Sequence, residues 1–154
     1  KVIRNDELTV DEIEKLHPDH IVLSPGPGYP KDAGVCEEVV LKLQGKVPIL
    51  GVCLGHQGIC EVYGATICHA KQLMHGKKST VTIDTKKAEV ARYHSLIADI
   101  DTIPEELEVI SVDENNEVMA VKHRRYDVYG LQFHPESIMT PDGMKIIENF
   151  LNLR

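Results

Sequence analysis

The chain has 154 residues, of which 27% are charged, and a formal net charge of −7. A negative charge argues against nucleic acid or an anionic membrane as a partner. The sequence holds no apolar run near the roughly 20 residues of a spanning helix and no signal-peptide pattern at its amino end, and its length predicts a single domain over residues 1–154.

Apolar periodicity in the amino-terminal part predicts strands and helices in alternation. Thr9 is a suitable N-cap for the first helix, and Pro18 ends that helix. Alternation with short connections is typical of a parallel sheet that is covered by helices on both faces. The predicted elements are strands at 1–6, 20–24 and 48–52 and helices at 10–16, 36–43 and 54–63.

From residue 65 onward the pattern changes to short apolar strands, with Asn115 and Asn116 as a hairpin turn. We therefore predict the α/β class, with an open, mainly parallel central sheet flanked by helices and a small antiparallel portion. The strands are expected at 65–67, 81–83, 107–112, 118–121 and 128–133, before a helix that begins at 141 and buries Met144, Ile147, Phe150 and Leu151.

Two features of this pattern are unusual. An open parallel sheet normally starts with a strand and a crossover helix, whereas this chain starts at what would be the second strand. The connection at 84–92 is also short and charged for a link between two strands. We expect that a strand and a helix are missing at the amino end and that residues are missing near 85–87.

The strongest motif is Gly51-Val52-Cys53-Leu54-Gly55, which lies between a predicted strand and a predicted helix. It has the G-x-nucleophile-x-G pattern of a strand-to-helix elbow, which presents its central residue at the carboxyl end of the strand. A helix N-terminus favours the thiolate form of a cysteine at that place. Cys53 is therefore the candidate nucleophile, and the alternative is an inert core cysteine.

The other cysteines complete no recognisable disulfide framework, so we expect reduced thiols and a cytoplasmic location. Cys53, His56 and Cys60 have the residue types of a metal site, but their spacing matches no standard zinc pattern. We predict neither a metal nor a cofactor. The remaining thiols are Cys36, Cys60 and Cys68.

Two further segments can serve a nucleophile at the elbow. The glycines of loop 25–30 leave backbone amides open to an anion or a carbonyl oxygen, although a tight connection would look the same. In His134-Pro135-Glu136 the carboxylate can fix the imidazole tautomer and leave the other ring nitrogen as a base; the alternative is a turn with a surface ion pair. With Cys53, these residues form a candidate Cys-His-Glu triad.

Together these motifs resemble the class I (triad) glutamine amidotransferases, from end to end of the chain. The resemblance rests on residues 24–28, 51–57 and 134–136. Residues 71–77 and 92–96 are similar to segments of the glutaminase component of anthranilate synthase and of aminodeoxychorismate synthase.

The resemblance implies a role for each matched residue. Cys53 would attack the side-chain amide of L-glutamine, His134 would carry the proton to the departing ammonia, and Glu136 would orient His134. The backbone N–H groups of Gly28 and Leu54 would hold the oxyanion. The substrate-binding residues would be Gly26, Pro27, Gly28, Gln57, Ser95 and Leu96.

The resemblance also implies a protein partner, a chorismate-using synthase subunit that receives the ammonia, with the segment around 74–77 facing it. Anthranilate formation for tryptophan is preferred over aminodeoxychorismate formation for folate, and one glutaminase shared by both is the third option. Two other classes stay open. One is another cysteine-elbow protein, such as a γ-glutamyl hydrolase or a protease-like chaperone, and the other is a binding subunit without turnover.

Overall fold

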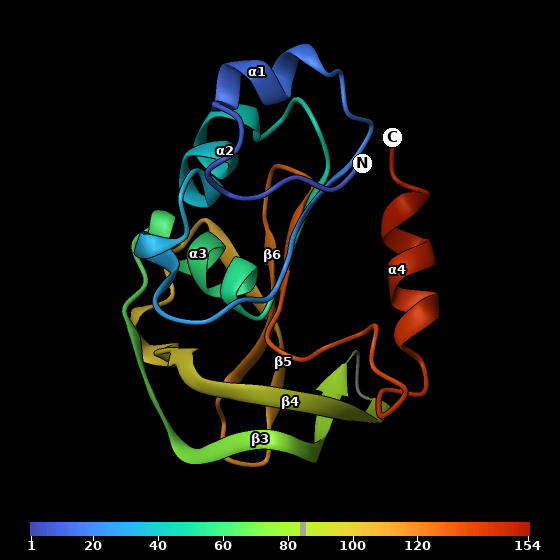
Figure 1. Cartoon of the computed structure of the whole chain (residues 1–154). Coiled ribbons are helices and arrows are strands. Elements are labelled where there is room, and N and C mark those ends of the chain that lie inside the picture. The colour runs from blue at the N-terminus through green and yellow to red at the C-terminus, as the bar shows by residue number, and fades with distance from the viewer. Residues whose placement is uncertain (84–85) are drawn as a thin grey trace.

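The computed structural model describes the backbone of residues 1–83 and 86–154, and the side chains of these residues except 72–77, 83 and 86. Its helices are α1 (Val10–Lys15), α2 (Cys36–Leu43), α3 (Leu54–Val62) and α4 (Gly143–Leu151), with 3-10 turns at Pro30–Asp32 and Ile100–Thr102. In Figure 1, α1, α2 and α3 lie on one side of the sheet and α4 lies on the other.

The strands of the described residues form one sheet in the order β1-β2-β7-β6-β5-β3-β4. β1 and β7 are both parallel to β2, and every other neighbouring pair is antiparallel. The strands are β1 (Ile21–Leu23), β2 (Ile49–Val52), β3 (Ile67–Ile83), β4 (Lys86–Ala98), β5 (Leu107–Asp113), β6 (Val118–His123) and β7 (Val128–Leu131).

The predicted α/β class, with an open sheet flanked by helices, is confirmed. Its antiparallel part extends further than the small portion we expected, because β3 and β4 pair along most of their length. Figure 1 shows these two strands running together along the bottom of the view. The parallel part, β1-β2-β7, carries the elbow that the sequence singled out.

Three predicted segments differ from the structure. Residues 1–4 form no strand, and Val2 is 97% exposed. The strands expected at 65–67 and 81–83 belong to one strand, β3, which also contains 71–77. Within the charged stretch at 84–92, residues 86–92 belong to β4 and not to a connection; residues 84 and 85, near the expected gap, lie outside the described part of the chain.

Apolar side chains pack on both faces of the sheet. One cluster joins α1, α2 and α3 to the sheet through residues such as Ile13, Val40 and Ile59. The other lies under α4 and includes Leu50, Cys53 and Phe150. Neighbouring residues of β2 enter opposite clusters, as the period of two in a strand requires.

The predicted buried stripe of the last helix is only partly correct. Phe150 is buried, and Ile146 packs against the same cluster. Met144 and Leu151 are 63% and 50% exposed, however, so they face away from the core. The inner face of the helix consists of Gly143, Ile146 and Phe150, which follow the i, i+3, i+7 spacing, and it meets the cluster on the sheet through Ile146 and Phe150.

The packing of α2 on α3 brings two carboxyl groups together. Burial, followed by the hydrogen bond and the charge of Glu61, raises the pKa of Glu37 from 4.5 to about 7. A group whose pKa is raised on folding makes its full contribution to stability only at pH values below its pKa in the unfolded chain. This stabilisation is lost as the pH rises through the folded pKa.

We therefore expect Glu37→Gln to raise the free energy of unfolding by about 1 kcal/mol at pH 8, after allowance for solvent screening, and to leave it unchanged at pH 4. Urea denaturation at the two pH values measures this difference. Glu38→Gln is the matched control, because Glu38 lies on the same helix in an exposed pair with Lys42. An equal effect of Glu37→Gln at both pH values would contradict the raised pKa of Glu37.

Candidate active site

The turn from β2 into α3 has the geometry of an elbow. Cys53 is the N-cap of α3 and has φ 53° and ψ −102°, which is a strained backbone for a residue with a side chain. Its N–H donates to the carbonyl of Leu131 on β7 at 2.8 Å. The backbone therefore fixes Cys53 at the carboxyl ends of two adjacent parallel strands, as the motif predicted.

The two glycines of the motif allow the helix to begin this close to the sheet. A Cβ atom on Gly51 would lie 2.5 Å from the carbonyl carbon of Gly55, and one on Gly55 would lie 2.3 Å from the carbonyl oxygen of Leu23 in β1. Real Cβ atoms do not approach backbone atoms so closely, and any larger residue would push α3 off the strands.

The sulfur of Cys53 is buried, and this decides its resting form. Burial raises the pKa of Cys53 to about 11, and the negative charge of Glu136 adds to the increase. The backbone amide of Leu54 and the side-chain amide of Gln132 lower the pKa, but by less. The thiolate that we expected from the helix N-terminus is therefore not the resting form, and the site needs a base.

Burial raises the pKa of the other thiols too. Burial raises the pKa of Cys60 to about 12, and it also raises those of Cys36 and Cys68. Reactivity at Cys53 must therefore come from neighbouring groups and from substrate binding rather than from a permanently ionised sulfur.

His134 and Glu136 lie together as predicted. Nδ1 of His134 and Oε1 of Glu136 are 2.6 Å apart, so the carboxylate accepts from Nδ1–H and fixes that tautomer. Nε2 of His134 is buried and has no hydrogen-bond partner among the described residues, the sulfur of Cys53 included. An oriented imidazole thus keeps one buried basic nitrogen uncommitted.

Neighbouring elements hold this imidazole in place. The N–H of His134 donates to the carbonyl of Ala91 in β4 at 3.0 Å, and the hydroxyl of Thr140 donates to the carbonyl of His134 at 2.7 Å. The ring of Tyr93 meets the imidazole edge to face, with 5.0 Å between centroids. These contacts come from β4 and from the turn before α4, and the sequence analysis named none of Ala91, Tyr93 and Thr140 as site residues.

The start of α4 packs directly on the same segment. A Cβ atom on Gly143 would lie 1.6 Å from the carbonyl oxygen of Pro135, so the first turn of the helix rests against the backbone between His134 and Glu136. A glycine is required here, and α4 is thereby tied to the candidate base.

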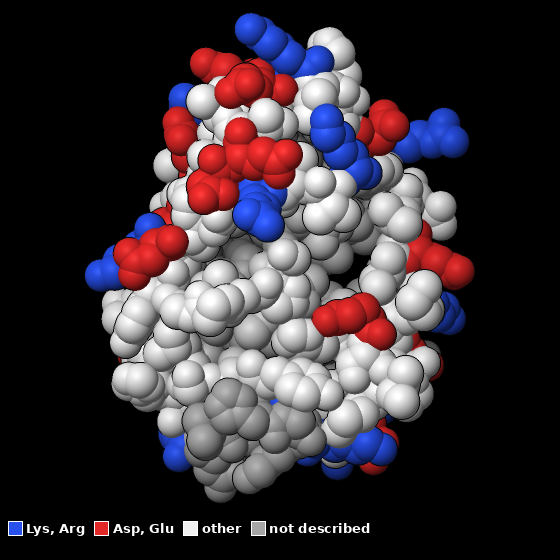
Figure 2. Space-filling model, in the orientation of Figure 1, with Lys and Arg blue, Asp and Glu red and all other residues white. Residues whose placement is uncertain are grey.

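The loop after β1 lies next to the elbow. A Cβ atom on Gly26 would lie 3.1 Å from Cδ2 of Leu54, which places the loop against the first residue of α3. Gly28 has φ 82° with open space beside it, and Pro27 is exposed. Figure 2 shows that this face of the molecule is hollowed near its middle, beside α3, and that mostly uncharged atoms border the hollow.

The residues expected to bind substrate divide into exposed and internal groups. Gln57 is 3% exposed, and its Nε2 donates to the carbonyl of Leu96 at 2.9 Å and to Oε1 of Gln132 at 3.1 Å. Leu96 is buried and Ser95 is partly exposed. The structure thus brings Gln57 and Leu96 together, with Cys53 close by through Gln132, whose Nε2 donates to the sulfur at 3.6 Å.

Sequence reasoning missed Gln132. It lies two residues before His134 and is completely buried. An isolated glutamine at the end of an apolar strand carries no pattern that would single it out, and only its position in the fold shows that its amide reaches the sulfur.

Within the described part of the chain, no three His, Cys, Asp or Glu side chains are grouped so that they could hold a metal ion. His56 and Cys60 of the metal hypothesis are 3.9 Å apart, and burial lowers the pKa of His56 to about 3. The described helices also include none with the length and apolar character needed to cross a membrane.

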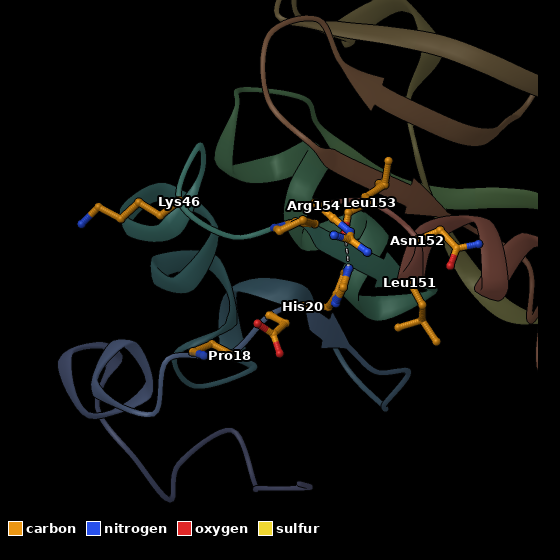
Figure 3. A pocket seen from close by; sticks show the side chains of 9 residues that line it. Pro18, His20, Lys46, Leu151, Asn152, Leu153 and Arg154 are labelled. Atoms are coloured by element: carbon orange, nitrogen blue, oxygen red, sulfur yellow. Dashed lines mark hydrogen bonds between the residues drawn. The ribbon is translucent and has the colours of Figure 1, made fainter.

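A second hollow lies at the opposite end of the parallel strands, before β1 and β2 (Figure 3). It has a volume of about 620 Å³, and Nε2 of His20 and the carbonyl of Leu153 lie 2.7 Å apart on its wall. It holds none of the predicted site residues. Its other lining residues are Pro18, Asp19, Lys46, Pro48, Leu151, Asn152 and Arg154.

The structure thus combines a cysteine on a strained elbow with an oriented histidine–carboxylate pair in an α/β fold. Residues 1–153 match the glutamine amidotransferase class-I family, and the chain belongs to that family.

Relatives share the sequence over almost the whole chain. This chain is 48% identical over 162 residues to the multifunctional tryptophan biosynthesis protein of Phycomyces blakesleeanus. The aligned region covers 99% of this chain and 21% of that protein. This chain is also 44% identical over 158 residues to the aminodeoxychorismate/anthranilate synthase component 2 of Bacillus subtilis, and the aligned region covers 97% of this chain and 81% of that protein. The chain thus spans about a fifth of the length of the fungal relative.

The fold is shared with a solved structure as well. A protein of Thermoplasma acidophilum, described as part of a GMP synthase, superimposes with a TM-score of 0.85 at 25% identity, over 98% of this chain and 78% of that one. The resemblance stated from the motifs is therefore confirmed at the level of the family and the fold.

Proposed function

We propose that the chain is the glutaminase part of a chorismate-aminating synthase, which hydrolyses L-glutamine to glutamate and ammonia. The observation that carries the proposal is the buried sulfur of Cys53 on its elbow, in a chain of the class-I family that also holds an oriented His134–Glu136 pair. A nucleophile with an oriented base is the arrangement that amide cleavage requires.

In this proposal His134 takes the proton of Cys53 as the sulfur attacks the side-chain amide carbon of glutamine. The uncommitted Nε2 then gives the proton to the leaving nitrogen, so that ammonia departs and a glutamyl thioester remains. Water, deprotonated by the same nitrogen, hydrolyses the thioester to glutamate. Glu136 holds the imidazole in one tautomer throughout.

The oxyanion of each tetrahedral intermediate would lie between the backbone N–H groups of Leu54 and Gly28. The amide of Leu54 already lowers the pKa of Cys53, so its N–H lies close to the sulfur. The loop that carries Gly28 rests on Leu54 through Gly26. Each such donor typically contributes about 10²–10³-fold to the rate.

The hydrogen bonds of Gln57 indicate how it would meet the substrate. Its amide nitrogen donates to two internal acceptors, whereas no hydrogen bond of the described residues uses its Oε1. An amide oxygen accepts hydrogen bonds, so it suits the α-ammonium group of glutamine rather than the carboxylate. Ser95 and the exposed Pro27 would border the rest of the substrate.

The partner would be a chorismate-using synthase subunit, and the location cytoplasmic. The names of the Phycomyces and Bacillus relatives support this choice. Because the Bacillus name includes both aminodeoxychorismate and anthranilate, a glutaminase of the folate pathway, or one shared by both pathways, is the second candidate. Segment 74–77, expected to face the partner, lies on β3 and pairs with β4, and its side chains are outside the described part.

A diazo-ketone analogue of glutamine tests the site directly. We expect it to modify Cys53 and to leave Cys36, Cys60 and Cys68 unmodified, because burial raises the pKa of all four thiols and only the glutamine site can select one of them. Mass spectrometry of tryptic peptides measures the modification, and excess L-glutamine should protect Cys53. Labelling spread over the partly exposed Cys36 and Cys68 would contradict the proposal.

A further inference from the structure

We propose that Gln132 is a positioning residue that aims a fixed N–H group at the sulfur of Cys53, with a direction imposed through Gln57 by the backbone carbonyl of Leu96, which also accepts from a buried His94 held by Arg92. The inference rests on the proposed function for its role in turnover. The hydrogen bonds themselves are contacts of the described residues and do not depend on that function.

The first link sets the tautomer of a buried histidine. A guanidinium can only donate, and Nε of Arg92 lies 2.9 Å from Nε2 of His94. Nε2 must therefore accept, so the proton of the neutral ring is on Nδ1, which donates to the carbonyl of Leu96 at 2.9 Å. Burial lowers the pKa of His94 to about 4, so the ring stays neutral and keeps this tautomer above that pH.

The hydrogen bonds that follow set the orientation of two side-chain amides. The carbonyl of Leu96 can only accept, so Gln57 must present its NH₂ group to it. The second hydrogen of that group goes to Oε1 of Gln132. Gln132 is left with its own NH₂ group on the opposite side, 3.6 Å from the sulfur of Cys53. Neither amide can be turned over without placing like groups against each other.

Charged partners hold the guanidinium of Arg92 in place. Nη1 of Arg92 donates to Oδ2 of Asp113 at 2.7 Å and to the hydroxyl of Ser79 at 3.1 Å, and Glu117 lies 3.7 Å from Nη2. The side chains of Arg92 and Asp113 are 1% and 0% exposed. A buried pair of this kind holds its geometry, because separating the charges leaves each of them unpaired.

The chemical consequence lies at the sulfur. A fixed N–H donor stabilises a thiolate more than a thiol, and it does so most strongly where water is excluded. Gln132 therefore offsets part of the burial of Cys53 when His134 removes the proton. The charge of Glu136 also acts on the sulfur and raises its pKa, and both Glu136 and His134 stay unchanged in the variants below.

The test measures alkylation of Cys53 by chloroacetamide as a function of pH, with mass spectrometry to separate the four cysteines. In Gln132→Met, which keeps the length but removes the donor, we expect the midpoint for Cys53 to rise by about one pH unit, with a rate at pH 8 about tenfold lower. In Gln132→Glu, which keeps the shape but puts an acceptor at the sulfur, the increase should be larger. Alkylation of Cys68 should be unchanged in both.

Gln44→Met is the matched control, because Gln44 accepts from the hydroxyl of Tyr63, away from the sulfur, and its loss should leave the Cys53 midpoint unchanged. Unchanged midpoints in both Gln132 variants, with the folded circular dichroism spectrum kept, would overturn the inference. The measurement uses no glutamine, so it stands apart from the glutaminase assignment. If that assignment holds, Gln132→Met should also lower kcat while KM stays close to its original value.

Discussion

Replacing Cys53 by alanine is expected to abolish glutamine-dependent product formation by the complex with the synthase and to leave ammonia-dependent formation intact. The sulfur is the group that bonds to the substrate, and loss of a triad nucleophile typically costs on the order of 10⁶-fold in rate. Added ammonia bypasses that step. The two rates, measured on the same complex by the fluorescence of the product, give the comparison.

Cys60→Ser is the control for this experiment, because Cys60 is also buried on α3 but touches none of the proposed reacting atoms. It should keep both rates. If Cys53→Ala also loses the ammonia-dependent rate, the residue serves folding or assembly, and its assignment as nucleophile is unsupported. A glutamine-dependent rate that survives Cys53→Ala would remove the covalent mechanism altogether.

Arg92→Met is expected to lower the free energy of unfolding by about 3–5 kcal/mol, since it leaves the carboxylates of Asp113 and Glu117 buried without their cation. Urea denaturation at pH 7 measures the loss. Adding Asp113→Asn and Glu117→Gln to the same chain should recover part of it, because the unpaired charges are then gone.

Arg124→Met provides the comparison. Arg124 and Glu108 form a pair at 3.8 Å in which both side chains are more than half exposed. Loss of such a pair costs less than about 1 kcal/mol. If the two arginine variants lose a similar amount of stability, the buried ion pairs of Arg92 with Asp113 and Glu117 are not as important for stability as their geometry indicates.

The helices and the parallel strands could be predicted because their signals are local. The helix predicted at 36–43 has the bounds of α2, and Thr9 is the N-cap of α1 as expected, within a capping box that also includes Glu12. The glycines of the elbow carry their reason in the sequence as well. His134 and Glu136 were identified because they are neighbours along the chain.

The remaining features depend on contacts between distant segments. β4 was missed because the charges of 84–92 suggest a connection between strands, whereas the structure places 86–92 in a strand and buries Arg92 by pairing it with Asp113. Met144 was placed in the core by its apolar side chain, but the close approach of Gly143 to Pro135 turns it outward. The role of Gln132 exists only where β7, α3 and β4 meet.

The contact between Gly143 and Pro135 joins the last helix rigidly to the segment from His134 to Glu136. With so little free space between the two backbones, α4 cannot tilt or slide without moving the peptide that joins His134 to Glu136. Any displacement of α4 from its outer surface, where Met144 and Leu151 are exposed, would thus change the orientation of the His134 imidazole.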